Sequence, residues 1–204
     1  MEDMALGTMC LAVHKNGKPV CVSGHSDATI LTSIIGGWVG DDDAASFHVS
    51  GMCDLPDERS AHLHWVEESK LNSGDRLRFE LVRSAAPSIP LTVEATDSPA
   101  YLADQAAFYE ATRDWVAPSE PPAARWPYLK FECAIDAGKP LAVGIPIGQE
   151  HILCSLAWNV WTPDICRVYV RTFSGSGRGI EPRETPWLRA NLVEGQALEL
   201  RVSW

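Results

Sequence analysis

"HWVEESKLNSGDRLRFELV" (His64–Val82) and "PWLRANLVEGQALELRVSW" (Pro186–Trp204) are two stretches of this sequence that follow the same pattern. Each begins near a Trp, continues to a Leu and a Gly, and ends in apolar residues at every second position. Such alternation is typical of a strand with one buried face. The second stretch is one residue shorter, and the agreement in order and residue type predicts that one β-unit occurs twice.

Further blocks repeat in the same order along the chain. The turn "NGKPV" (Asn16–Val20) returns as "AGKPL" (Ala137–Leu141). The apolar run "ATILTSIIGGWV" (Ala28–Val39) falls on "EHILCSLAWNVW" (Glu150–Trp161) after a shift of one residue, and "SFHVSG" falls on "CRVYVRT". Matching several blocks in order by chance is improbable, so these blocks indicate an internal duplication.

The predicted fold class is mainly β (α+β), with two tandem duplicated β-meander or sandwich-like units that pack pseudo-symmetrically and one linker helix. The predicted boundaries are 8–84 for the first repeat, 85–127 for the linker and 128–204 for the second repeat. A helix is expected at about 99–115, since Ser98 can cap it and Pro99 suits the first helical position. Its aromatic residues predict that it packs on a sheet.

Five strands are expected in each repeat. The run Ala28–Val39 fits either a helix or a bent strand, and its β-branched residues and Gly36-Gly37 favour the strand. His62–Lys70 is interpreted as a short helical turn. One unit alone would bury little surface, so we expect the two units to pack with related faces meeting. The predicted strands are Cys10–Lys15, Val20–Gly24, Ala28–Val39, Phe47–Gly51, Arg76–Val82, Leu129–Ile135, Leu141–Ile145, His151–Trp161, Arg167–Phe173 and Ala197–Trp204.

Charge is distributed unequally between the predicted repeats. The chain has 17 basic and 27 acidic residues and a net charge of −10. Residues 10–82 carry 6 basic and 11 acidic residues, whereas residues 128–204 carry 8 of each. An acidic surface repels nucleic acids and membranes and attracts basic proteins. The charge therefore indicates either simple solubility or a basic protein partner, with no nucleic acid and no membrane.

Cysteine and histidine raise the question of a metal site. The six cysteines form no CxxC pair, and we expect buried free thiols. Cys21, His25 and Cys53 could join a zinc site, and His62 and His64 would share one side of an extended segment. The second repeat has no matching ligands, so no metal and no cofactor are expected.

Catalytic signatures are absent from the sequence. It contains no GxSxG, HExxH or Walker motif, and "GSGRG" (Gly175–Gly179) is followed by prolines where a phosphate-binding loop needs a helix. The three acids Asp41–Asp43 are interpreted as a solvated loop or as a contact loop for a basic partner. The prediction is that the protein is not an enzyme and has no catalytic residues.

Location is predicted from what the sequence lacks. No run reaches the roughly 18 to 20 apolar residues that a membrane helix needs. The start, "MEDMALGTMC", has no basic segment typical of a secretory signal. A cytoplasmic protein is expected.

The repeated unit, with its NGKP hairpin, "TILTSIIGGWV" strand and "LNSGDRLRFELV" ending, resembles uncharacterised small bacterial proteins with a similar short β-unit. In size and acidity the chain also resembles, by type alone, bacterial immunity proteins, which bind and neutralise a cognate toxin. This likeness implies an inhibitor that occludes a toxin through an acidic surface. The residues expected to bind the partner are Asp41, Asp42, Asp43, Asp54, Asp57 and Glu58.

Two other functions stay open. The repeats could hold a small ligand or a substrate in a pocket between them, lined by Trp38, Trp158 or Trp161. The protein could also have a purely structural or assembly role.

Overall fold

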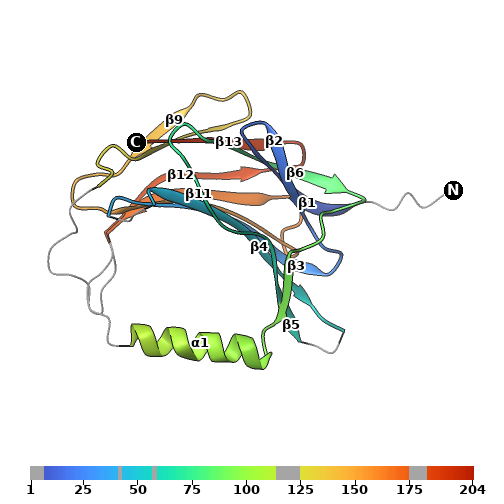
Figure 1. Cartoon of the computed structure of the whole chain (residues 1–204). Coiled ribbons are helices and arrows are strands. Elements are labelled where there is room, and N and C mark those ends of the chain that lie inside the picture. The colour runs from blue at the N-terminus through green and yellow to red at the C-terminus, as the bar shows by residue number, and fades with distance from the viewer. Residues whose placement is uncertain (1–6, 41–42, 57–58, 114–124, 175–182) are drawn as a thin grey trace.

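The described residues form two antiparallel β-sheets that lie face to face, with one helix outside them (Figure 1). This is a computed structural model, and it describes residues 7–40, 43–56, 59–113, 125–174 and 183–204. The prediction of a mainly β fold is confirmed.

The first sheet has six strands in the order β2-β1-β6-β13-β8-β9. Its central strands alternate between buried and exposed residues, because one face covers the core and the other faces outward. The strands are β1 (Thr8–Lys15), β2 (Lys18–Ser23), β6 (Arg76–Ser84), β8 (Lys130–Ile135), β9 (Leu141–Gly144) and β13 (Ala197–Ser203).

The second sheet has seven strands in the order β12-β11-β10-β3-β4-β5-β7. The same alternation places one face of these strands on the core. The strands are β3 (Ala28–Trp38), β4 (Ala45–Asp54), β5 (Ser60–Lys70), β7 (Thr92–Ala95), β10 (His151–Asn159), β11 (Cys166–Phe173) and β12 (Glu184–Leu192).

Both sheets show that the chain is built from two related halves. Strands β1 to β6 correspond in order to β8 to β13, and apart from β7 each sheet has the same order of related strands from either edge. The halves join edge to edge, through β6 with β13 and through β3 with β10. The pseudo-symmetric arrangement of repeated units is confirmed. The expectation that related faces meet is wrong, because each sheet runs continuously through both halves.

The junction between β6 and β13 lies on the approximate twofold axis. Leu77 pairs with Leu200, and Phe79 pairs with Leu198, so related residues exchange partners. Arg78 and Glu199, which are 121 positions apart, face each other at the centre and form an ion pair of 2.9 Å. The pairing register therefore obeys the same symmetry as the sequence repeat.

The two hairpin turns are related differently from what the GKP motif indicates. Asn16 and Asp136 both have a positive φ, of 54° and 50°. The Asn16 N–H donates to the carbonyl of Arg76 and its side chain accepts from the Arg76 N–H. Asp136 makes the same two bonds with Ala197. Asn16 therefore corresponds to Asp136, one position away from the alignment of the two GKP triplets.

The shift of one residue expected between Ala28–Val39 and Glu150–Trp161 is also wrong. It would place the buried Leu31 on Leu153, whose side chain faces outward. The observed pairs Leu31 with Trp158 and Ile152 with Gly37 are exchanged by the twofold axis only if Leu31 corresponds to Ile152. These two side chains are both buried.

Residues 62–70, expected to form a helical turn, belong instead to the eleven-residue strand β5. Two irregularities in its pairing with β4 disturb the simple alternation of side chains. One lies at Trp65, and β12 has the same irregularity at the related Trp187. The other lies between Val66 and Ser69 and is absent from β12, which accounts for the additional residue in the first half.

The strand count also differs from the prediction. Each half has six related strands instead of five, because β5 and β12 were not expected as strands. Strand β7 is an addition at the edge of the seven-stranded sheet, paired to β5.

The two halves share one hydrophobic core. Phe79 and Phe131 are fully buried, as are Leu31 and Leu156 from the opposite sheet, and all belong to a single cluster. The six cysteines are buried and free, as expected: Cys10, Cys21, Cys53, Cys133, Cys154 and Cys166. Burial raises the pKa of the Cys21 thiol to about 12 and that of Cys133 to about 11, so these groups stay protonated.

Helix α1 (Pro99–Thr112) begins at the expected cap, where the Ser98 side chain accepts a hydrogen bond from the N–H of Tyr101. It lies beneath the seven-stranded sheet, on the side away from the six-stranded sheet (Figure 1). The expectation that it packs on a sheet is wrong for most of its length, because none of its residues is buried. Tyr101 makes the side-chain contact to the sheet, stacking on His62 of β5.

Within the described ranges, no helix has the length and apolar character needed to cross a membrane.

Candidate functional site

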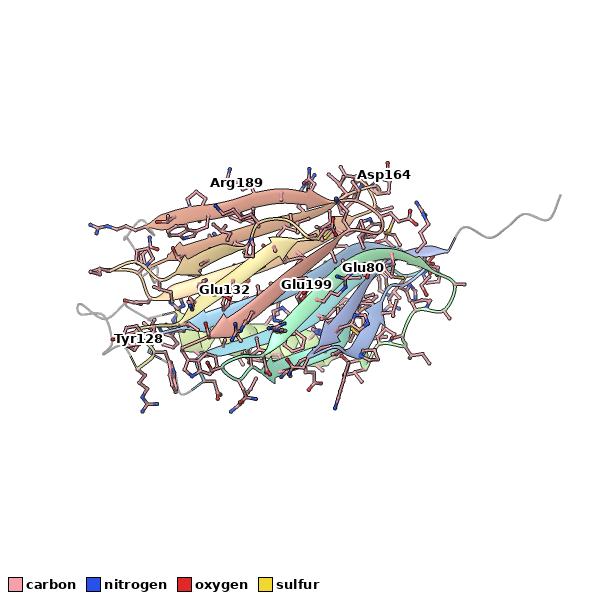
Figure 2. All side chains as sticks on the ribbon, turned by 90° about the horizontal axis from the view of Figure 1, so that it is seen from above. Glu80, Tyr128, Glu132, Asp164, Arg189 and Glu199 are labelled. Atoms are coloured by element: carbon pink, nitrogen blue, oxygen red, sulfur yellow. The ribbon has the colours of Figure 1, made fainter. Side chains whose placement is uncertain are left out.

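The face of the seven-stranded sheet that points away from the core, called the outer face here, carries several large side chains that are only partly buried. On β3, β10 and β11 the residues of this face are half-buried or exposed, although several of them are large. Helix α1 lies on the same side of the sheet (Figure 1). The opposite surface of the molecule, on the six-stranded sheet, presents charged residues that include Glu80, Glu132 and Glu199 (Figure 2).

Three rings form a row across neighbouring strands at one end of the outer face. Trp38 of β3 pairs with His151 of β10, which pairs with Phe173 of β11. The Trp38 and His151 ring centroids are 5.3 Å apart, and those of His151 and Phe173 are 4.8 Å apart, with both pairs stacked. We call Trp38, His151 and Phe173 the ring row. It crosses the junction of the two repeats, since β3 belongs to the first and β10 to the second.

A cavity of about 390 Å³ adjoins the ring row, and we call it the Trp38 cavity. Gly36 forms part of its lining, and a Cβ atom built on this residue would meet no atom within 4 Å. The described lining residues are Gly36, Gly37, Trp38, Asp43, Ala44, Ala45, Ser46, Glu68, Lys70, His151, Ile152, Leu153 and Phe173.

Charged groups stand at the β4 and β5 side of this cavity. The Lys70 ammonium lies 2.6 Å from the Asp43 carboxylate. Glu68 accepts a hydrogen bond of 2.8 Å from the Ser46 hydroxyl, and no cationic group of the described residues lies within ion-pair distance of it. The described lining therefore carries two carboxylates and one ammonium, which favours a positively charged ligand.

His151 is neutral at neutral pH in this setting. Burial lowers its pKa, and the Glu150 carboxylate, 3.9 Å away, opposes that effect only in part. An imidazole without charge stacks on Trp38 and Phe173 without adding a positive charge to the row. The ring row is therefore an apolar wall of the cavity at neutral pH.

The related end of the outer face is different. There, Asn159 pairs with Ile30, and Ile30 pairs with Met52. The twofold axis relates these three residues, in this order, to Trp38, His151 and Phe173. No ring stands at any of these positions. The scaffold therefore does not require the ring row.

The position related to the cavity wall on β4 and β5 is basic in the second half. A hollow of about 470 Å³ is lined there by Arg167, Tyr169 and Arg189, among others. The Arg189 guanidinium lies 4.9 Å from the Tyr169 ring centroid, and Figure 2 shows Arg189 on the outermost strand. The two ends of the outer face thus differ in charge as well as in shape.

Histidines occupy the region between the ring row and helix α1. His62 and His64 point to the outer face, as expected for an extended segment, and their ring centroids are 6.4 Å apart. His62 Nε2 lies 3.1 Å from the Tyr101 hydroxyl. Burial lowers the pKa of His48, and the nearby His64 lowers it further. Among the residues that the structure describes, no three side chains of the metal-binding types are grouped to hold a metal ion.

The predicted partner-binding acids do not gather at one described place. Asp43 precedes β4 and Asp54 ends it, which separates them by about 30 Å for a ten-residue strand. Asp43 pairs with Lys70, whereas Asp54 is exposed. Asp41, Asp42, Asp57 and Glu58 lie outside the described residues, as does the loop Gly175–Gly179. This set of partner-binding residues stays a prediction.

The three tryptophans expected around a pocket have different positions. Trp38 lines the cavity and is 36% exposed. Trp158 is buried and donates its indole N–H to the carbonyl of Pro163 at 2.8 Å. Trp161 is exposed and does not line the Trp38 cavity.

Sequence reasoning missed His151, Phe173 and Glu68. His151 and Phe173 are brought beside Trp38 by strand pairing across the repeat junction, which the sequence pattern did not predict. Glu68 lies in the irregularity where β5 has one residue more than β12, and this difference was visible as the unequal length of the two repeats. Comparing the repeats position by position at the correct offset could have identified all three.

A scan against protein-family models, a search of curated proteins and a search of solved structures each find no match for this chain.

Proposed function

We propose that this protein is a non-enzymatic protein-binding module, of the type of a bacterial immunity protein that occludes a cognate toxin. The observation that carries the proposal is a set of exposed apolar residues on α1 and on the segment that precedes it. This α1–β7 surface consists of Ile89, Leu91, Val93, Leu102, Phe108 and Tyr109, each more than half exposed.

The α1–β7 surface has the composition of a binding site. A helix of 14 residues is marginally stable by itself in water, and α1 buries none of its residues. Phe108 and Tyr109 stand side by side on it, with ring centroids 6.1 Å apart. Exposed groups of large apolar residues on a soluble protein mark interaction sites. Aromatic residues of this kind anchor protein interfaces.

The charge around this surface favours a basic partner. Residues 83–127 carry 3 basic and 6 acidic residues, and the first repeat adds a larger negative charge. Acidic residues at the rim of an apolar surface accelerate association with a positively charged protein and reject nucleic acids. This combination suits an inhibitor that meets a basic toxin, such as a nuclease, in a one-to-one complex.

The proposal is tested with the product of the gene next to the one that encodes this chain. The full chain and the neighbouring product are mixed, and their affinity and stoichiometry are measured by calorimetry. We expect a one-to-one complex that abolishes the toxic activity. Replacing both Phe108 and Tyr109 by Ala weakens it by about thirtyfold or more, as for the loss of a hot spot.

Trp161→Ala is the matched control, because Trp161 is also an exposed aromatic residue but lies in a different part of the fold. It should bind as the wild type does. A neighbouring product that is not toxic or does not bind would overturn the proposal, as would a Phe108/Tyr109 variant that binds with unchanged affinity.

A second candidate function is that of a small-ligand-binding protein. The Trp38 cavity favours it, because this cavity lies where β3 of the first repeat meets β10 of the second. A screen of small fragments by NMR tests it: shifts that cluster at Gly36, Trp38 and Ser46 support a ligand site.

A further inference from the structure

Phe173, at one end of the ring row, already contacts a planar cation. The guanidinium carbon of Arg171 lies 5.1 Å from the Phe173 ring centroid. Arg171 is held by Glu184 at 2.6 Å, and Glu184 is the cross-strand partner of Phe173. The hydrogen bonds from Tyr169 and Arg171 hold the pKa of Glu184 below its usual value, so it is ionised. A ring, a guanidinium and a carboxylate thus occur together at this end.

At the other end of the ring row, the Trp38 ring and the Glu68 carboxylate both line the Trp38 cavity. His151 covers one face of Trp38, and β10 lies on that side of β3. The cavity lining includes Ala44 and Ser46 on the opposite, β4 side of Trp38 as well as residues of β10 and β11. Trp38 is 36% exposed, so part of its ring is open to a ligand in the cavity. Glu68, which belongs to β5, is also part of the cavity lining. Its only described hydrogen bond is the one from the Ser46 hydroxyl.

The floor of the cavity leaves room for a flat group. Gly36 has no side chain, and its neighbour across the pair on β4 is the small Ser46. A volume of about 390 Å³ is larger than a guanidinium on a short aliphatic chain needs. The nearby Lys70 ammonium is paired with Asp43, which leaves the charge of Glu68 uncompensated within the described lining.

The related position in the second half shows that these features are not imposed by the scaffold. Asn159, without a ring, corresponds to Trp38, and Ala157 corresponds to Gly36. Glu68 lies in the irregularity of β5 that β12 lacks. The first half therefore contains a ring (Trp38), a glycine (Gly36) and a carboxylate (Glu68) that the second half, which has the same fold, lacks at the related positions.

We infer that the Trp38 cavity binds a planar cation of the guanidinium class. Trp38 stacks on the plane of the cation, and the two carboxylate oxygens of Glu68 accept hydrogen bonds from its N–H groups. Guanidinium groups suit this pairing because they are flat, stack on indole rings and present parallel N–H donors. The inference takes as its premise the second candidate function, that the cavity holds a ligand, and it does not depend on the toxin-inhibitor proposal.

The test is a titration of the isotope-labelled full chain, followed by NMR, with two ligands of equal charge and chain length. Propylguanidine should shift the signals of Gly36, Ser46 and the Trp38 indole N–H. Propylamine should bind at least about fivefold more weakly, because an ammonium group neither stacks nor forms two parallel bonds. A blocked peptide with one arginine tests the other source of this chemistry, a side chain of a partner protein.

Two variants locate the binding. Glu68→Gln should weaken propylguanidine binding by about tenfold, since a charged hydrogen-bond acceptor is lost. Trp38→Leu should weaken it by about fivefold through loss of the stacked ring. Glu67→Gln is the matched control: it removes the same charge from the adjacent, exposed residue, and it should leave the affinity unchanged. Thermal unfolding of each variant verifies that the fold is retained.

Each outcome decides between the proposals. Equal affinities for propylguanidine and propylamine, or equal effects of Glu67→Gln and Glu68→Gln, would overturn the inference in favour of general attraction to acidic residues. If other fragments shift the signals of the cavity residues and propylguanidine does not, the guanidinium inference is overturned and the second candidate function stands. No fragment shifting them would overturn both. A peptide that binds at least about tenfold more tightly than propylguanidine would identify the natural ligand as an arginine of a partner.

Discussion

The two ends of the outer face occupy related positions on one scaffold, and they differ almost completely. One end has Trp38, His151 and Phe173 in a row beside an acidic cavity. The other has Asn159, Ile30 and Met52 beside a basic hollow. The side chains on the core face of the same strands are mostly apolar in both halves, and the buried Ser33 and Thr172 are polar exceptions. The fold thus constrains one face of each strand and leaves the other free to acquire a binding site.

The largest loss of stability is expected when related core side chains are removed from each half. Phe79 and Leu200 occupy equivalent positions and are at most 1% exposed. We expect Phe79→Ala to lower the free energy of unfolding by about 3–5 kcal/mol and Leu200→Ala by about 2–5 kcal/mol. Because the halves share one core, urea unfolding followed by fluorescence and by circular dichroism should give one transition in both variants.

Two separate transitions, with only one of them shifted, would show that the halves fold independently. Lys139→Ala provides a control, because this residue lies in an exposed turn. Its unfolding curve should match that of the wild type.

A smaller effect is expected at a polar position that differs between the halves. Asp75 accepts hydrogen bonds from the Asn72 N–H and the Asn16 side chain, and its carboxylate lies 3.0 Å from the Lys15 ammonium. Burial opposes ionisation of Asp75, but these contacts outweigh it and lower its pKa. The related Gln196 accepts one similar bond, from the Val193 N–H.

Asp75→Asn should lower the free energy of unfolding at neutral pH by about 1.5–3 kcal/mol, whereas Gln196→Ala should lower it by about 0.5–1.5 kcal/mol. The folded pKa of Asp75 lies below the ordinary aspartate value of 3.8. Its contribution is therefore complete above that value and is lost as the pH falls through the lowered pKa.

Urea unfolding at several pH values measures this dependence. The difference between wild type and Asp75→Asn should shrink at acid pH, and the effect of Gln196→Ala should not change with the ionisation of residue 75. A pH-independent difference for Asp75→Asn would refute the assigned role of its charge.

The smallest effect is expected on the twofold axis itself. Arg78 and Glu199 form their ion pair with side chains 39% and 51% exposed, and Arg78 also contacts Glu80. A double-mutant cycle with Arg78→Ala and Glu199→Ala should give a coupling of about 0.2–1 kcal/mol, decreasing with salt. A coupling well above this range would mean that the pair fixes the register of the junction.

Much of the scaffold could be predicted from the sequence, because repetition is visible as a pattern. The alternation in Arg76–Val82 and in Ala197–Trp204 correctly predicted strands β6 and β13. The helix start at Pro99 followed from its capping residues. These features depend on neighbours in the chain, which sequence reasoning detects well.

The errors have physical causes as well. Strand β5 was mistaken for a helical turn because its two irregularities interrupt the period of two that identifies a strand. The edge-to-edge union of the halves was missed because alternating residues suit either edge pairing or face packing. The ring row needs side chains from three strands to meet, and only the pairing of β3 with β10 brings them together.

The union of the halves through shared sheets has a consequence for synthesis on the ribosome. Residues that meet at the junction, such as Arg78 and Glu199, are 121 positions apart. At about 5–20 residues per second, the edge of β6 is made roughly 6–24 s before its partner β13. During that interval the nascent chain exposes unpaired strands that can pair with other chains. We therefore expect the newly synthesised protein to depend on chaperones until its last strand has paired.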